Sequence, residues 1–370
     1  MIPIFKPSYN EEELEVLKET LQSGWTGMGP KTREFEERFA EYIGVRHAVA
    51  VNSCTAALHL ALMVMGVKGY EVIAPPITFI STIHAIFYNV ATPVFTDIYP
   101  DTLNINVDEI KKNISPMTRA IVVVHYGGHP CDMDPILKIA KEHNIKVIED
   151  AAHGCGGQYK GRMIGSLGDI ACFSFHAVKN LSTGDGGMIT TNDPEIFERL
   201  KRLRWLGINQ DTWSRANKGR TYSWRYDVEE MGFKYTMNDI AASIGLVQLK
   251  KLDVNNEKRR EIATRYNRAF SDLKWIETPI QRDYAKSAHH NYVIKTNRRD
   301  QLNEWLKDKG VSSSVHYIPC NQFEMYKGYG KATPIADQVW KRLLTLPLYP
   351  DLTEVDFNII VESVRSFKTV

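Results

Sequence analysis

The sequence predicts an α/β fold: a large domain with a mainly parallel central sheet, followed by a smaller C-terminal α+β domain. Short apolar runs alternate with amphipathic helical segments before residue 150, which is the order expected of a parallel sheet covered by helices. After Asp239 the pattern changes, and long helical segments dominate. The length of 370 residues is enough for two such domains.

The predicted large domain covers residues 1–248 and begins with two amphipathic helices. Strands and helices then alternate, with apolar residues at strand or helix spacing. The expected helices are 11–23, 31–43, 55–65, 81–88 and 135–142, and the expected strands are 47–51, 71–74, 92–96, 120–124 and 145–148. In such sheets ligands bind at the carboxyl ends of the strands. Asp150 and Ser53 both follow strands, so we expect them to face one cleft.

The predicted small domain covers residues 249–370, and its boundary is expected near 245–260. A strongly apolar helix with small residues is expected at 240–252, and a separate, polar helix at 256–273. The remaining elements are expected as a strand at 292–295, a helix at 299–309, a strand at 312–316 and a last helix at 354–367.

The composition excludes several classes of function. Lys and Arg number 46 and Asp and Glu 44, so the net charge of +2 indicates no nucleic-acid partner. The five cysteines lack metal-ligand spacing, which predicts no metal site and fits reduced thiols in the cytoplasm. No run of about 18 apolar residues would span a membrane. We therefore expect a cytoplasmic protein that binds no membrane and acts on a cytosolic metabolite.

Lys179 is the first candidate for chemistry. It ends an apolar run that begins at Ile170, and the glycines Gly184, Gly186 and Gly187 follow it. Glycines let the backbone pass close to a planar cofactor. A lysine presented from a buried segment is what a pyridoxal phosphate (PLP) enzyme requires, because its amine binds the cofactor covalently. A surface lysine ahead of a turn is the alternative.

Asp150 ends an apolar strand and is the candidate partner of the PLP ring nitrogen. A carboxylate there would keep that nitrogen protonated, so that the ring accepts electrons. Glu149 should point to the opposite face by strand alternation, which favours Asp150. Capping of a helix is the alternative role for Asp150. His153 is a candidate contact of the cofactor's phenolic oxygen, or else a hydrogen-bonded core histidine.

Hydroxyl and amide groups suited to a phosphate lie between a strand and a helix. The backbone amides of Ser53, Cys54 and Thr55 open a helix N-terminus, which favours an anion. Simple capping of that helix explains the same residues equally well. Ser174 is another candidate phosphate ligand, and Phe79 is a candidate to stack on the pyridine ring or to pack in the core.

The segment 207–225 is rich in Trp, Tyr and Arg. Long polar loops are often functional, and arginines suit a phosphorylated ligand. Arg215 and Arg220 are therefore candidate substrate contacts, and a surface loop without function is the alternative.

Together these motifs resemble the DegT/DnrJ/StrS family of PLP-dependent nucleotide-sugar aminotransferases over nearly the whole chain. The motifs that carry the resemblance are Ser23–Pro30, Asn52–Ala57, Ile148–His153, Phe173–Gly187 and Gly232–Ile240. The sequence around Asp150 and Lys179 is most similar to the sequences of enzymes that aminate UDP-linked 4-keto sugars, of the UDP-4-amino-4-deoxy-arabinose type.

The resemblance implies the aspartate-aminotransferase fold (type I) and a homodimer with its sites at the subunit interface. It implies transfer of an amino group from L-glutamate to a nucleotide-linked keto sugar, for amino-sugar or lipopolysaccharide synthesis. It assigns Lys179 to the covalent bond with PLP and Asp150 to the ring nitrogen. His153 lies beside the phenolic oxygen, Phe79 on the ring, and Ser174 with residues 53–55 at the phosphate. The implied substrate contacts are Trp25, Thr26 and His316.

Two positions depart from the family pattern. Cys54 stands where the family often has glycine, which adds bulk but leaves the amides available. Lys234 stands where the family often has an asparagine that reaches the partner subunit's phosphate, and a lysine would bring a full charge there.

Three alternatives to this function remain open from the sequence. They are a C3-keto-sugar aminotransferase acting on a dTDP-sugar, a PLP-dependent sugar dehydratase, and a PLP-binding regulator without catalysis. Lys179 argues against the dehydratase, because members of that branch replace the lysine by histidine. Regulators of this kind usually carry a DNA-binding extension, which the sequence does not indicate.

Overall fold

The structure is a computed structural model that describes residues 1–210, 213 and 226–367. Its centre is a seven-stranded sheet with the order β1-β9-β8-β5-β4-β2-β3. The strands are β1 (His47–Val51), β2 (Glu71–Ala74), β3 (Thr92–Phe95), β4 (Thr118–Val124), β5 (Lys146–Asp150), β8 (Ile170–Ser174) and β9 (Gly187–Thr191). β9 is antiparallel to both of its neighbours, and the other pairs are parallel. The prediction of an α/β fold with a mainly parallel sheet is confirmed.

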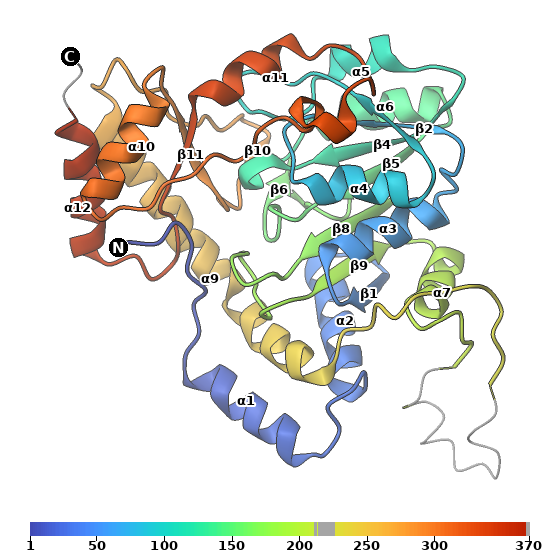
Figure 1. The fold of residues 1–370 in the computed structure, drawn as a ribbon. Coiled ribbons are helices and arrows are strands. Elements are labelled where there is room, and N and C mark those ends of the chain that lie inside the picture. Colours follow the sequence, from blue (N-terminus) through green and yellow to red (C-terminus); the bar gives the residue numbers. More distant parts are fainter. Residues whose placement is uncertain (211–212, 214–225, 368–370) are drawn as a thin grey trace.

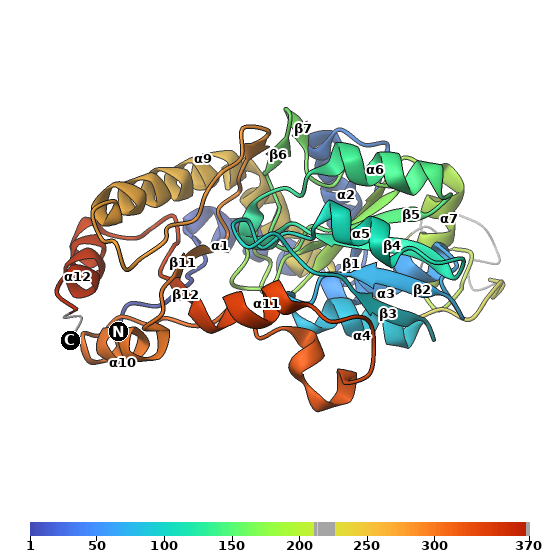
Figure 2. The same ribbon diagram turned by 90° about the horizontal axis from the view of Figure 1, so that it is seen from above.

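Helices cover both faces of this sheet (Figure 2). One face carries α3 (Cys54–Val64), α4 (Ile80–Tyr88) and α7 (Pro194–Leu203), and the other carries α2 (Pro30–Ile43), α5 (Val107–Asn113) and α6 (Met133–Glu142). Strand alternation produces the two apolar layers, because neighbouring residues point to opposite faces. In β1, Val49 and Val51 join the layer under α3, whereas Ala48 and Ala50 join the layer under α2.

A second body contains the C-terminal elements and its own apolar core. β11 (Tyr292–Lys295) and β12 (Leu343–Leu346) form an antiparallel pair, flanked by α10 (Arg299–Asp308) and α12 (Glu354–Arg365). Its core includes Tyr266, Phe270, Leu306 and Ile360, and Ile2 also packs into it. Figure 1 shows the N-terminus beside α10 and α12, before the chain crosses to α1 (Glu11–Gln22).

One long helix, α9 (Asp239–Phe270), connects the two bodies (Figure 1). The prediction of separate helices at 240–252 and 256–273 is therefore wrong. No glycine or proline interrupts 251–258, and the fully buried Asn256 continues the helix while its amide bonds to other segments. The helix runs through residue 248, where the predicted domain boundary lies.

The other difference in this region concerns the predicted strand at 312–316. Within it, the described structure has a single bridge from Ser314 to Thr345 and no strand. The partner of β11 is β12, which the sequence did not predict. The small remaining elements are β6 (Gln158–Tyr159), β7 (Arg162–Met163), β10 (Ala285–Lys286) and α11 (Pro334–Val339). No helix among the described residues has the length and apolar character needed to cross a bilayer.

Candidate active site

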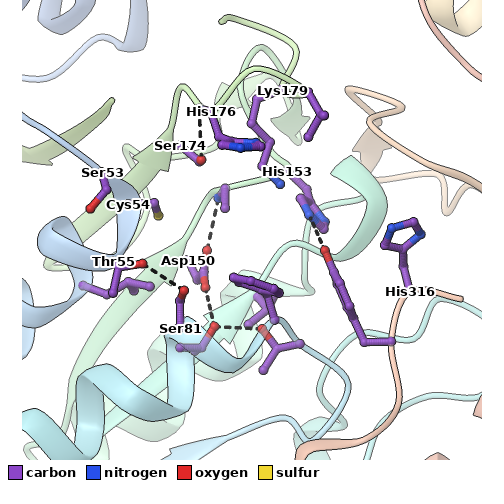
Figure 3. Close-up of a pocket in the computed structure, with 18 of the residues that line it drawn as sticks. Ser53, Cys54, Thr55, Ser81, Asp150, His153, Ser174, His176, Lys179 and His316 are labelled. Carbon is purple, nitrogen blue, oxygen red and sulfur yellow. Dashed lines mark hydrogen bonds between the residues drawn. The ribbon is translucent and has the colours of Figure 1, made fainter. Parts of the chain in front are cut away.

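A cavity of about 410 Å³ opens at the carboxyl ends of the central strands, a size suited to a small molecule. The predicted site residues that line it are Ser53, Cys54, Thr55, Phe79, Asp150, His153, Ser174, Lys179 and His316. Figure 3 shows the N-terminus of α3 on one side of the cavity, His153 and His316 on the other, and Lys179 above Asp150.

Lys179 reaches this cavity from the turn that follows β8. Its backbone N–H donates to the carbonyl of His176 at 2.8 Å, which closes the turn. Its amine lies 3.5 Å from Nε2 of His290. Burial lowers the pKa of Lys179 from 10.5 to about 8, and the charge of Asp150 partly opposes this effect. A free amine with such a pKa is neutral often enough near neutral pH to act as a nucleophile or base.

Asp150 is the last residue of β5 and is buried. One carboxylate oxygen accepts a hydrogen bond from the Thr82 hydroxyl at 2.7 Å, and the other accepts one from the Ala152 amide at 3.1 Å. Burial raises the pKa of Asp150, and these two bonds oppose the rise. A carboxylate that is desolvated in this way is stabilised by a cationic partner in the cavity.

Glu149 points to the opposite side of the sheet, as strand alternation predicts. Its carboxylate binds His125 at 3.0 Å and accepts backbone hydrogen bonds from Gly165, Leu167 and Gly168. The two adjacent acids therefore differ in role: Glu149 is fully engaged within the protein, whereas Asp150 faces the cavity.

The N-terminus of α3 forms the other end of the cavity. The Ser53 hydroxyl accepts from the Ala56 amide at 3.1 Å, and the Thr55 hydroxyl donates to Ser81 at 2.8 Å. The Ala56 amide is used in this capping bond and the Ala57 amide in the first helical bond, whereas the amides of Cys54 and Thr55 have no acceptor among the described residues and can bind an anion. Burial raises the pKa of the Cys54 thiol well above its ordinary value, which keeps it uncharged. Ser174 adds a hydroxyl at the end of β8.

Two neutral histidines lie on the opposite wall. His153 is buried, and its Nε2 lies 3.3 Å from the Tyr317 hydroxyl. Burial lowers the pKa of His153 well below its ordinary value. His316 pairs through Nδ1 with the Thr345 hydroxyl at 2.8 Å, and burial lowers its pKa to about 4. Phe79, 56% exposed, stands at the rim of the cavity.

The comparisons with known proteins identify the family. The sequence profile of the DegT/DnrJ/EryC1/StrS aminotransferase family matches residues 7–365. The chain belongs to this family. It is 44% identical to the spore coat polysaccharide biosynthesis protein SpsC of Bacillus subtilis, over 98% of this chain and 96% of that protein.

Solved structures agree with this assignment. The aminotransferase TlmJ from Streptoalloteichus hindustanus superposes with a TM-score of 0.93 at 36% identity, over 99% of this chain and 98% of that one. The protein Spr1654 from Streptococcus pneumoniae, solved in a PLP form, superposes with a TM-score of 0.91 at 32% identity, over 99% and 100% of the two chains. The present chain is therefore a sugar aminotransferase that uses PLP.

The cavity of this sugar aminotransferase fits PLP in its chemistry. An amine, a buried carboxylate and a helix N-terminus with hydroxyls match the aldehyde, the ring nitrogen and the phosphate of the cofactor. Glycine at 187 leaves room for the start of α3, because a Cβ there would lie 2.6 Å from the backbone of Ser53. Any side chain at 187 would therefore displace the turn that begins α3.

Three predicted site residues lie outside the lining of this cavity in the described chain: Trp25, Thr26 and Lys234. The indole of Trp25 donates to the carbonyl of Met28 at 3.2 Å, and Thr26 is exposed. The amine of Lys234 lies over the ring of Trp205, 3.4 Å from its centre. Arg215 and Arg220 lie outside the described residues.

The sequence motifs around residues 23–30 and 232–240 meet through one side chain. The carboxylate of Asp239, at the start of α9, accepts hydrogen bonds from the amides of Gly29, Lys31 and Thr32 and from the Thr32 hydroxyl. The segment that carries Trp25 and Thr26 is thus anchored beside the segment that carries Lys234.

Sequence reasoning missed three residues of the site. Thr82 bonds directly to Asp150, Tyr317 bonds to His153, and His290 contacts Lys179. Tyr317 adjoins His316, a predicted site residue, but a tyrosine in that segment is equally suited to the core. Thr82 and His290 come from segments without a motif of their own, so their roles emerge only from the fold.

Proposed function

We propose that the protein transfers the amino group of L-glutamate to the keto group of a nucleotide-linked sugar, and that a UDP-linked 4-keto sugar is its substrate. The observation that carries the proposed amino transfer is the pair formed by the Lys179 amine and the buried Asp150 in one cavity. The relationship to SpsC, a polysaccharide biosynthesis protein, supports a place in the synthesis of a glycan.

The residues of the cavity have different roles in this reaction. PLP, when bound, supplies an electron sink for the carbon that loses or gains a proton. Lys179 holds the cofactor and, once free, carries that proton as base and then as acid, for which a pKa of about 8 is well suited. Asp150 holds the proton on the ring nitrogen. Residues 53–55 and Ser174 bind the phosphate, and His153 lies on the side of the phenolic oxygen.

We further propose that two copies of the chain share their active sites. Trp25, Thr26 and Lys234 are predicted site residues, yet they lie away from the cavity of their own chain in the described structure. Asp239 holds their two segments together, which would let them reach a partner's cavity as a unit. Lys234 would then face the partner's phosphate end, while His316 contacts the sugar nucleotide within one chain.

The test is a panel of substrates with purified protein, PLP and L-glutamate. UDP-, dTDP- and GDP-linked 4-keto and 3-keto sugars are each incubated with the protein, and products are followed by mass spectrometry. The proposal predicts an amino sugar and an equal amount of 2-oxoglutarate with a UDP-linked 4-keto sugar. Amination of a dTDP-linked 3-keto sugar alone would contradict the proposed substrate, a UDP-linked 4-keto sugar. Loss of a sugar hydroxyl without an amino product would indicate a dehydratase.

A further inference from the structure

His290, in the segment before β11, packs against two other rings beside the active-site lysine. Its ring is buried and stacks on Phe5, with the ring centres 5.1 Å apart and the planes 2° from parallel. It also packs against His153, with the ring centres 4.3 Å apart and the planes tilted by 34°. These contacts fix the ring plane, so the orientation of its two nitrogens is set by hydrogen bonds.

Those hydrogen bonds come from Asn180, the residue after Lys179. The amide nitrogen of Asn180 donates to Oδ1 of Asn256 at 2.7 Å and to the carbonyl of Ala288 at 2.8 Å. The orientation of Asn256 is fixed in turn, because its own amide nitrogen donates to the carbonyl of Cys155 at 3.0 Å. Both donors of Asn180 are therefore used, and its Oδ1 remains as an acceptor.

This arrangement determines the tautomer of His290. Oδ1 of Asn180 lies 3.1 Å from Nδ1 of His290, so Nδ1 must carry the proton. Nε2 then has a free lone pair, and it lies 3.5 Å from the amine of Lys179. Burial lowers the pKa of His290 well below its ordinary value, which keeps the ring neutral and Nε2 an acceptor.

We propose that His290 is a positioning residue for transamination: its Nε2 accepts a hydrogen bond from the free amine of Lys179 and so directs the amine's lone pair toward the cavity. The role belongs to the stage in which Lys179 has been displaced from the cofactor and must move a proton. A neutral amine on four rotatable bonds would otherwise sample many orientations, and orientation of a base contributes substantially to its rate.

Three substitutions separate this role from simple packing. His290→Phe keeps an aromatic ring in contact with Phe5 and His153 but removes the acceptor. His290→Gln places an amide oxygen near the position of Nε2 and retains the acceptor. His289→Asn is the matched control, because the neighbouring histidine has a left-handed backbone (φ 44°) that asparagine tolerates and is not among the described hydrogen-bond partners of Lys179.

The first readout is the first half-reaction, which rests on the proposed function because it uses L-glutamate. The decay of visible absorption is followed in a single turnover of the PLP-loaded protein. His290→Phe should slow the limiting rate by about 10- to 100-fold with little change in the glutamate concentration for half-maximal rate. His290→Gln should remain within a few-fold of the wild type, and His289→Asn should match it.

The second readout uses the cofactor-free protein and needs no amino donor. Labelling of Lys179 by trinitrobenzenesulfonate is measured as a function of pH by mass spectrometry. His290→Phe should move the midpoint to lower pH, because the ammonium form loses an acceptor, and His290→Gln should restore it. If glutamate proves not to be the donor, only the first readout fails, and the labelling midpoint still decides the role of His290.

Two results would overturn the inference. One is a His290→Phe variant with wild-type rate and wild-type labelling midpoint. The other is a His290→Gln variant that is as impaired as His290→Phe in both readouts, which would assign the effect to ring packing. If His290→Phe does not fold, His290→Asn replaces it, because the shorter amide falls short of Lys179 while remaining polar like glutamine.

Discussion

At the scale of single residues, burial acts in opposite directions on the two groups that face each other in the cavity. It lowers the pKa of Lys179 and raises that of Asp150, because it disfavours the charged form of each. The lysine is thereby made a better nucleophile. The carboxylate is made dependent on a positive partner, which the protonated pyridine ring of PLP would provide.

The first prediction concerns the pH dependence of Lys179 in the cofactor-free wild-type protein. Its folded-state pKa of about 8 lies below the ordinary lysine value, so the neutral, reactive amine predominates above about pH 8. Labelling of the Lys179 peptide should rise with pH and level off with a midpoint near 8, whereas exposed lysines in the same digest continue to rise beyond pH 10. Equal midpoints for Lys179 and the exposed lysines would contradict the burial of this amine.

The second prediction concerns the charge of Asp150. Asp150→Asn preserves size and can still accept from Thr82, but it cannot hold a proton on the ring nitrogen. The rate of the first half-reaction should fall by about 10²-fold or more, as for loss of one preorganised electrostatic group. The exposed pair Lys160–Asp134 offers a control, since Asp134→Asn should leave that rate unchanged. A wild-type rate for Asp150→Asn would remove Asp150 from the mechanism.

The sequence was informative about individual site residues where a motif combined residue type with a place at a strand end. Asp150, Lys179 and residues 53–55 were predicted in this way, and they line one cavity. Thr82 and His290 were not predicted, because their importance depends on contacts across 68 and 111 positions of the chain. A threonine in a helix and a histidine in a loop carry no signal of such contacts.

At the scale of elements, the start of α3 depends on the strand packed beneath it. A Cβ at Gly187, the first residue of β9, would lie 2.6 Å from the carbonyl carbon and 2.7 Å from the carbonyl oxygen of Ser53. The backbone cannot give way as a flexible side chain would. The end of the cavity that we propose to bind the phosphate therefore requires glycine at 187.

The third prediction follows from this contact. Gly187→Ala should displace the turn at Ser53 and weaken PLP binding about tenfold or more, the effect expected of an overpacked site. Gly168→Ala is the matched control, because its Cβ would lie 2.7 Å from the carbonyl oxygen of Val147, at the other end of the sheet. It should cost stability to a similar degree and leave PLP affinity unchanged. Equal PLP affinities for wild type and Gly187→Ala would contradict this account.

The strands β1 to β5 and the helices α1 to α4 and α6 were predictable because each is amphipathic or uniformly apolar and ends at a clear turn. The strands β8 and β9 and the helices α5 and α7 were not predicted. The prediction failed where tertiary contacts determine whether a segment is a helix or a strand and where it ends. Asn255 and Asn256 are buried, and α9 continues through the break that was predicted between residues 252 and 256. The apparent strand at 312–316 lies beside the true strand β12 and makes one bridge to it.

At the scale of the whole molecule, α9 connects the sheet body to the C-terminal body. Its first half packs against α1 and α2, and its last turns carry Tyr266 and Phe270 into the C-terminal core. His316 and Tyr317, from the C-terminal part, complete the wall of a cavity whose other residues come from the sheet body. The site therefore depends on how the two bodies are held together.

The fourth prediction concerns the proposed sharing of sites between two chains. Lys179→Ala and Lys234→Ala proteins should each have little activity alone. When they are mixed under conditions that exchange subunits, half of the dimers are mixed, and one site in each has both lysines. Activity should recover to about a quarter of the wild-type value per chain, as random pairing in a two-fold dimer requires. No recovery despite demonstrated exchange would place Lys234 outside the partner's site.

The most direct test of the central claim is the visible absorption spectrum of the purified protein with PLP, before and after addition of L-glutamate. The wild type should show the visible absorption band that makes PLP enzymes yellow, and glutamate should bleach this band as 2-oxoglutarate appears. Lys179→Ala should lack the band of the covalently held cofactor. A band that forms equally well without Lys179, or that no amino acid bleaches, would contradict the assignment of Lys179 as the residue that binds PLP and carries the proton.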